Sequence, residues 1–466
     1  MKKLTLLLFI FSSMAFAAGD GAPHLDGAGL SIYWVIPFAG ILLSIAIFPL
    51  VAPHFWHHHF GKISAFWAVL LIVPFLFKAG FSITFYELLH VGLLEYVPFI
   101  ILLLSLFTIS GGVQLTGSLV GKPIVNTGVI FIGTILASWM GTTGAAMLLI
   151  RPLIRANKYR EKKVHVIVFF IFLVANIGGS LTPLGDPPLF LGFLKGVDFF
   201  WTTTAMFVPM LFLVVCLLAI FFALDTYLYN KEESHPVPDS PEKLGLKGSF
   251  NLILLLGVIG GVLLSGFWRP HISFEVYHVH LELQNIVRDV LLLGLTVASW
   301  KMTSQSIRKA NEYTWFPIVE VAKLFAGIFI TIIPAIAILK AGADGALSAI
   351  ISSVSNEAGP INYMYFWATG ILSSFLDNAP TYLVFFNTAG GDPSVLMGDL
   401  SQTLLAISAG AVFMGANTYI GNAPNFMVKS ISESSGIEMP SFFGYFFKWS
   451  VPILIPLFVL VSLIFF

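Results

Sequence analysis

Long apolar runs, separated by short polar stretches, make up most of this chain. Most runs reach the length of about 20 residues that a helix needs to cross a membrane, although Asp289–Trp300 is short. The pattern therefore predicts an all-α polytopic membrane protein with about 10 crossing helices. The predicted crossings are Ser31–Val51, Ser64–Phe81, Gly92–Gly111, Val164–Leu194, Phe200–Tyr229, Phe250–Trp268, Asp289–Trp300, Phe316–Leu339, Thr403–Lys429 and Phe446–Phe466.

Two of these crossings are interrupted by polar residues, glycines and prolines. One interruption reads A-N-I-G-G-S-L-T-P-L-G-D-P-P-L-F over Ala175–Phe190, and the other reads G-A-N-T-Y-I-G-N-A-P-N-F-M-V over Gly415–Val428. Proline removes a backbone donor and glycine tolerates unusual dihedral angles, so both helices should be broken here. Such paired interruptions are typical of a transporter binding site. The breaks are assigned to Gly185, Pro187, Pro188, Gly421 and Pro424.

Two further apolar stretches carry a polar kink in their middle. Pro123–Ile154 is broken at G-T-T-G, which begins at Gly141, and Ile361–Thr388 is broken at D-N-A-P, which ends at Pro380. Irregular backbone at membrane depth is tolerated only where protein or a water-filled cavity satisfies it. We therefore predict two re-entrant hairpins rather than two more crossings.

One internal offset relates all four breaks. A shift of 236 residues places Thr182 on Thr418 and Asp186 on Asn422, and the same shift places Thr142 on Asn378. A single register for hairpin tips and broken helices indicates two structural repeats.

The repeats define the predicted domains. Residues 18–229 form the first transmembrane repeat and 249–466 the second, and the proline-containing stretch 230–248 is a cytoplasmic connector. Residues 1–17 have a basic start, a short apolar run and small residues at the end, which is the layout of a signal peptide. The alternative is a retained first helix. Either way, the start of the mature chain should lie outside the cytoplasm.

Lysine and arginine set the predicted orientation, because they gather in cytoplasmic loops. Alternating the crossings from an external start places the basic stretch 151–163 inside, and the acidic stretch 389–402 outside. The two hairpins then enter from opposite sides, so the repeats are inverted. We expect external N- and C-termini and a bacterial-type inner (plasma) membrane.

The composition agrees with a membrane protein and excludes several other classes. The 466 residues are 57% hydrophobic and only 10% charged, whereas a soluble domain is about 25% charged. There is no basic patch for nucleic acid and no phosphate-binding loop, and the single cysteine excludes an internal disulfide. We expect no enzyme and no cofactor; the partners are the lipid bilayer and inorganic cations.

Two motifs resemble the ion transporter superfamily. They are S-S-F-L-D-N-A-P at Ser373–Pro380 and N-I-G-G-S-L-T-P-L-G-D-P-P at Asn176–Pro188. The chain looks most similar to the NhaD-type sodium/proton antiporters and the related arsenite and citrate permeases. This resemblance implies inverted repeats, each with one hairpin and one broken helix, and it allows a homodimer. The carboxylate carriers of the group have Ser-Asn-Thr at both tips, and this chain departs from that at both.

The residues at the breaks favour a cation. Sodium prefers oxygen ligands, and a carboxylate withdrawn from water can hold either a proton or a cation. We therefore expect a secondary active transporter, a Na⁺/H⁺ antiporter that works by alternating access, with sodium and protons as transported ions. A citrate/dicarboxylate symporter or an arsenite efflux permease is the alternative. The expected ion-binding residues are Asp186, Asp377, Asn378, Thr142, Thr143, Asn176, Thr182, Asn417, Thr418 and Asn422.

The two acidic residues are the expected sodium ligands, and we rank them. Asp377 comes first, because Asp186 aligns with the neutral Asn422 and could instead cap the half-helix that begins at Pro187.

Overall fold

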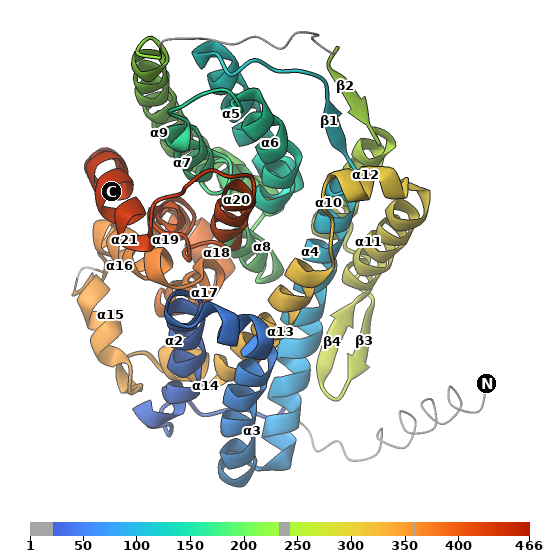
Figure 1. Ribbon diagram of the computed structural model, residues 1–466. Coiled ribbons are helices and arrows are strands. Elements are labelled where there is room, and N and C mark those ends of the chain that lie inside the picture. The colour runs from blue at the N-terminus through green and yellow to red at the C-terminus, as the bar shows by residue number, and fades with distance from the viewer. Residues whose placement is uncertain (1–21, 233–242, 358) are drawn as a thin grey trace.

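The computed structural model describes residues 22–232, 243–357 and 359–466, and these residues fold almost entirely as helices (Figure 1). The signal peptide predicted for residues 1–17 lies outside the described residues, as does the middle of the predicted connector. The helices of the first part are α2 (Ile36–Val51), α3 (Pro53–Val91), α4 (Val97–Ser110), α5 (Pro123–Met140), α6 (Thr142–Ala156), α7 (Val164–Leu173), α8 (Pro187–Leu194) and α9 (Phe199–Tyr229).

The second part contains more and shorter helices. They are α10 (Phe250–Phe267), α11 (Leu283–Met302), α12 (Gln305–Ala310), α13 (Phe316–Thr331), α14 (Ile333–Lys340), α15 (Ser348–Val354), α16 (Asn362–Phe375), α17 (Asn378–Thr388), α18 (Pro393–Met397), α19 (Ser401–Met414), α20 (Ala423–Ser434), α21 (Phe442–Tyr445) and α22 (Ile455–Phe465). Short 3₁₀ and π turns join several of them: η1 (Ile32–Val35), η2 (Gly92–Tyr96), η3 (Ile177–Leu181), η4 (Gly342–Asp344), η5 (Gly415–Asn417) and η6 (Phe446–Leu454).

The described strands form three small antiparallel pairs outside the helical body. They are β1 (Gln114–Thr116) with β2 (Gly245–Lys247), β3 (Ser273–Val276) with β4 (Val279–Glu282), and β5 (Ser355–Asn356) with β6 (Gly359–Pro360). The first pair ties the stretch before α5 to the end of the predicted connector.

The all-α membrane architecture is confirmed, but fewer helices pass as crossings than the ten predicted. Seven described helices, or eight if the bent pair α13–α14 counts as one, are long and apolar enough to span a membrane. The difference arises where helices are joined or broken. Pro53–Ser110 counts as one run of 58 residues, although Gly80 interrupts it with a φ of 80°. The limbs α19 and α20 have only 14 and 12 residues, too few to span alone.

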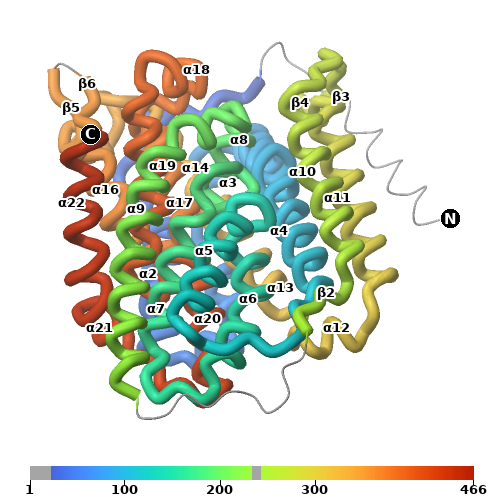
Figure 2. The backbone as a smooth tube through the Cα atoms, turned by 90° about the horizontal axis from the view of Figure 1, so that it is seen from above, coloured from blue at the N-terminus to red at the C-terminus, as the bar shows by residue number. Residues whose placement is uncertain are grey.

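Both predicted hairpins are present, and they enter from opposite ends of the protein. α5 turns into α6 at Gly141, whose φ of 78° favours glycine, and α16 turns into α17 at Asp377. In Figure 2, β5, β6 and α18 flank the second hairpin at one end, together with β3 and β4. β2 and α12 lie at the other end. β1, which pairs with β2, directly precedes α5, so the first hairpin begins at that end. This is the relation that inverted repeats require.

The centre of the protein is α7. Nine of its ten residues are buried, eight of them apolar side chains such as Phe169 and Phe172. A helix that is apolar all round must be covered on every side, and α7 contacts α5 and α9 from the first half and α20 from the second. The two halves therefore share one core, and the breaks that follow α7 and α19 lie inside it.

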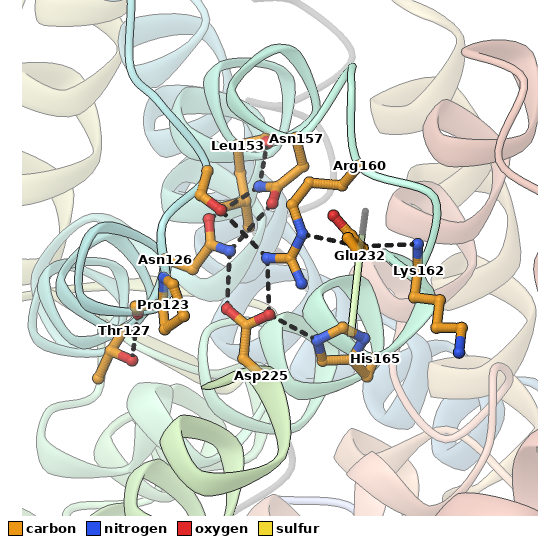
Figure 3. A network of polar contacts seen from close by, with 11 residues as sticks. Pro123, Asn126, Thr127, Leu153, Asn157, Arg160, Lys162, His165, Asp225 and Glu232 are labelled. Atoms are coloured by element: carbon orange, nitrogen blue, oxygen red, sulfur yellow. Dashed lines mark hydrogen bonds and ion pairs between the residues drawn. The ribbon is translucent and has the colours of Figure 1, made fainter. Parts of the chain in front are cut away.

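A buried polar network fastens the base of the first hairpin (Figure 3). The Asp225 carboxylate of α9 accepts from Arg160 at 2.7 Å, from His165 at 2.8 Å and from Asn126 of α5 at 2.9 Å. Arg160 also pairs with Glu232 at 3.2 Å, and the side chains of Asn126 and Asn157 bond each other. The network joins both limbs of the hairpin to α7 and α9, so it holds the hairpin while its tip reaches the core.

Replacing Asp225 with asparagine should lower the free energy of unfolding by about 3–5 kcal/mol, because it leaves Arg160 buried beside one remaining carboxylate. Thermal unfolding of the purified protein in detergent measures this change. Asp399→Asn, at an exposed position, is the matched control and should change stability by less than about 0.5 kcal/mol. Equal effects of the two substitutions would contradict the structural role of the network.

Candidate functional site

The two broken helices have the same construction. After α7 the chain makes the 3₁₀ turn η3, and Asp186 precedes α8, whose first two residues are Pro187 and Pro188. After α19 it makes η5, and Asn422 precedes α20, which has Pro424 in its first turn. Proline suits the first turn of a helix because the backbone N–H groups there have no intrahelical partner. Each break thus ends with a polar residue at the start of a half-helix.

Close backbone approach explains the glycines at the breaks. A Cβ atom on Gly185 would lie 2.1 Å from the carbonyl oxygen of Gly179, and one on Gly421 would lie 2.5 Å from that of Gly415. No larger residue fits without moving the backbone. The first hairpin tip is bonded to the first break here, because the Thr142 N–H donates to the Gly185 carbonyl at 2.9 Å.

The predicted internal register recurs in the hydrogen bonds. Thr182 donates to the carbonyl of Ser138, and Thr418, 236 residues later, donates to that of Ser374 at 2.5 Å. The serine hydroxyls repeat the relation, since Ser138 bonds the Gly178 carbonyl and Ser374 the Met414 carbonyl. Each hairpin is therefore tied to its own broken helix by the same bonds.

Asp186 is the point at which both halves meet. Its Oδ1 accepts from Asn422 Nδ2 at 2.9 Å and from Thr142 Oγ1 at 3.3 Å. Its Oδ2 accepts from Asn378 Nδ2 at 2.5 Å. The residue is only 1% exposed, and all three donors are neutral. Both hairpin tips and the second break thus each contribute one side chain to a carboxylate that comes from the first break.

The expected ranking of the two carboxylates is not supported by this geometry. Asp186 makes no side-chain cap bond to α8, although it occupies the N-cap position. Asp377 does cap a helix, because its carboxylate accepts from the Ala379 N–H at 3.0 Å. The alignment of Asp186 with a neutral asparagine was misleading, since Asn422 is one of the donors to the Asp186 carboxylate.

A cavity of about 110 Å³ lies beside these residues, which is room for several water molecules. Asp186, Asp377, Thr142, Thr143 and Asn422 supply its polar groups. Among the described residues that line it, none is Lys, Arg or His. The rest of the wall is largely apolar and includes Leu102, Leu103, Leu106 and Phe107 of α4 and Pro317, Ile318, Val321 and Phe325 of α13.

Five of the predicted site residues lie near the breaks but do not line this cavity. One of them is Asn378, which donates to Asp186 as described above. Thr182 and Thr418 make the backbone bonds described above, Asn417 donates to Ser374 Oγ at 2.9 Å, and Asn176 donates to the Ile171 carbonyl and to Asn425 Oδ1, both at 2.7 Å. The side-chain oxygens of Asn176, Asn378 and Asn417 are buried without a hydrogen-bond partner.

Sequence reasoning missed three residues that hold the site. Ser138 and Ser374 obey the 236-residue offset and could have been found with it. Asn425 joins the halves through Asn176 and also donates to the carbonyls of Gly415 and Thr418, each at 2.8 Å. Its counterpart in the first half is the apolar Leu189, so the 236-residue offset could not identify Asn425 as a polar residue of the site.

Comparison with known proteins gives one match. The family described as "Putative citrate transport" (CitMHS_2) matches residues 27–466 of the chain. No curated protein matches the chain.

Proposed function

The chain belongs to the CitMHS_2 transporter family, which makes it a multi-pass membrane protein and a secondary transporter, and we propose that it exchanges sodium ions for protons at the Asp186 cavity. One observation carries this proposal. The Asp186 carboxylate is buried and receives three neutral donors, and none of the described residues that line the cavity beside it is cationic. A buried carboxylate of this kind needs a proton or a cation as its partner.

The surrounding oxygen atoms suit sodium. The carboxylates of Asp186 and Asp377 line one cavity together with the hydroxyl-bearing Thr142 and Thr143. The unpartnered amide oxygens of Asn176 and Asn378 are further acceptors at the breaks. Sodium is a hard cation that prefers oxygen ligands, so these groups form the proposed site.

Exchange follows from competition for the same oxygens. A proton on Asp186 removes the negative charge that attracts sodium, and a bound sodium ion favours the deprotonated carboxylate. If the site opens to one side of the membrane and then to the other, it carries sodium in one direction and protons in the opposite direction. No separate proton pathway is required for this coupling.

Citrate transport is the second candidate, and the description of the family favours it. The cavity itself does not provide the groups that a free tricarboxylate would need, because Asp186 and Asp377 both oppose a negatively charged substrate. Citrate would therefore have to enter with a neutralising cation or protons. Arsenite efflux, the third alternative, has no supporting contact in the cavity.

Proton flux in proteoliposomes that contain the purified protein separates these functions. Gradients of sodium, lithium, potassium, citrate and arsenite are imposed in turn, and the internal pH is followed with a dye. We expect sodium alone to drive proton movement in the opposite direction. Proton movement that depends on citrate and not on sodium would replace the antiporter with a symporter.

Replacing Asn378 with alanine should raise the sodium concentration required for half-maximal exchange by about tenfold or more, because a hydrogen bond to a charged group contributes about 1.5–3 kcal/mol. The measurement is sodium-driven proton flux at several sodium concentrations. Asn387→Ala is the control. Asn387 is also buried in α17, and its side-chain amide donates to the Leu383 carbonyl of the same helix, so this variant should have the same sodium dependence as the unaltered protein. The same sodium dependence in both variants would remove Asn378 from the site.

The membrane orientation stays a prediction, as do the division into domains, the external termini, the bacterial-type inner membrane and the homodimer. Lys158 and Asp392 are exposed and lie beside opposite hairpins. A single cysteine at Lys158 should react with a membrane-impermeant thiol reagent only from the cytoplasmic side. One at Asp392 should react only from outside. Labelling of both from the same side would contradict the inverted repeats.

A further inference from the structure

A partly buried ion pair joins the end of α8 to the long α3–α4 helix. Lys195 follows α8 and its Nζ donates to Glu95 Oε1 at 2.5 Å. The Glu95 side chain is 5% exposed and that of Lys195 is 21% exposed. The backbone holds Lys195 in place, because the N–H of Val197 closes the helix end on the Gly192 carbonyl at 3.0 Å and Gly196 has a φ of 104°.

Glu95 occupies an irregular position in its own helix. It lies in η2, a π turn between α3 and α4, and such turns occur frequently at functional sites. Its second oxygen, Oε2, is buried without a hydrogen-bond partner. A carboxylate with one oxygen paired to a lysine and the other unsatisfied is less stable than a fully bonded one. The Glu95 carboxylate is therefore held by Lys195 through one oxygen, and its other oxygen makes no hydrogen bond that would stabilise the contact.

Other charged groups surround the pair. Lys340, at the end of α14, interacts electrostatically with Lys195, Glu95 and Glu87. His90 interacts with Glu95, Lys195 and Lys340. Glu87 interacts electrostatically with Lys195 as well. When Lys195 and Glu95 separate, Lys195 therefore retains Glu87, and Glu95 retains Lys340, as a neighbour of opposite charge, which lowers the cost of opening.

The pair and the cavity lie toward different ends of the protein. The cavity reaches Pro317 and Ile318 in the first turn of α13, which follows α12. Lys195 comes nine residues after Asp186, roughly 13 Å along a helix, and α8 lies toward the end that carries β3 and β4 (Figure 2). Neither Lys195 nor Glu95 lines the cavity.

We propose that the Lys195–Glu95 ion pair is a latch that closes the path from the β3–β4 end to the Asp186 cavity, and that it opens when the site is exposed on that side. The half-helix that begins next to Asp186 is held at its other end by this side-chain ion pair to η2, between α3 and α4. Breaking it frees α8 to move away from that helix. This inference rests on the proposed alternating access, in which the Asp186 cavity opens to one side of the membrane and then to the other. It does not depend on which ion is carried.

The test measures access to the cavity, so it needs no transported ion. Cys216→Ser removes the single cysteine of the chain, and Leu102→Cys then places a thiol on the cavity wall in α4. A membrane-impermeant thiol reagent is applied from the β3–β4 side, with Ser273→Cys at an exposed position of β3 as the control for sidedness. Addition of Lys195→Met should accelerate labelling of Leu102→Cys by about tenfold or more, which corresponds to about 1.4 kcal/mol.

Two further variants show whether the charge pair is responsible. The exchanged pair Glu95→Lys with Lys195→Glu should return labelling to within about threefold of the starting rate. Lys340→Met removes the same charge from the same cluster but leaves both partners of the ion pair in place, so it should not accelerate labelling. Should Lys195→Met fail to insert, Glu95→Gln breaks the pair from the other side and is expected to give the same acceleration.

Labelling that does not accelerate when the pair is broken would overturn the latch. An exchanged pair that labels as fast as Lys195→Met would also overturn it, because the contact would then act by shape and not by charge. Failure of sodium-driven exchange in proteoliposomes, with these labelling results intact, would remove the antiporter and leave the latch in place.

Discussion

Replacing Asp186 with asparagine should abolish sodium-driven proton exchange, with a loss of more than about a hundredfold. The side chain keeps its size but can no longer hold a proton or attract a cation. Its new amide group would also face the amides of Asn378 and Asn422, which now donate to the carboxylate. Disrupting a buried charged centre of this kind costs about 3–5 kcal/mol, which exceeds the loss expected for any single neutral ligand.

Sodium-driven proton flux at several pH values measures this effect, with the amount of inserted protein determined in parallel. Asp198→Asn is the matched control, because Asp198 is exposed and caps α9 through the Phe200 N–H, and asparagine retains that cap. Its exchange should equal that of the unaltered protein. Substantial exchange by Asp186→Asn would show that the carboxylate does not carry the coupling.

Replacing Asp377 with asparagine should remove the negative charge of the second carboxylate while keeping its role as a helix cap. Asparagine can still accept from the Ala379 N–H, so the cap of α17 persists. The cavity nevertheless loses one of its two negative charges. We expect the protein to insert and unfold as before, while the apparent affinity for sodium falls by about tenfold or more, as for the loss of one charged ligand.

Asp377→Ala provides the comparison, because it removes both the charge and the cap. It should lose sodium affinity to the same extent and also lose about 1 kcal/mol of stability. Sodium titrations of proton flux and thermal unfolding distinguish the two variants. If Asp377→Asn retains the full sodium affinity and only Asp377→Ala is impaired, the residue is a helix cap and not a ligand.

Much of this arrangement could be predicted from the pattern of residues. Glycine and proline reveal broken helices by removing donors or allowing unusual dihedrals, and Gly185 and Pro187 occupy the expected positions. The 236-residue offset placed Thr142, Asn378 and Asn422 in equivalent breaks, and these three side chains do converge on Asp186. A repeated polar break in an apolar chain indicates a shared site, because the free backbone groups are unfavourable at membrane depth unless other parts of the protein or a water-filled cavity satisfy them.

Contacts between the halves were harder to predict. Hydropathy could not show that α3 continues through η2 into α4 as far as Ser110, since the bend at Gly80 and the π turn leave the apolar run almost unchanged. Nor could the alignment of equivalent positions identify Asn425, whose counterpart is apolar. The helix cap that was considered for Asp186 is made by Asp377 instead. A cap bond depends on where the side chain points, and both residues have the sequence of a cap.

The most direct test of the account is the release of protons when sodium binds. Purified protein is placed in weakly buffered detergent solution, sodium chloride or choline chloride is added, and the change in pH is recorded. If Asp186 holds either a proton or a sodium ion, sodium should release protons, choline should release none, and Asp186→Asn should abolish the response. Sodium binding without proton release, or equal release by Asp186→Asn, would contradict competition at this carboxylate.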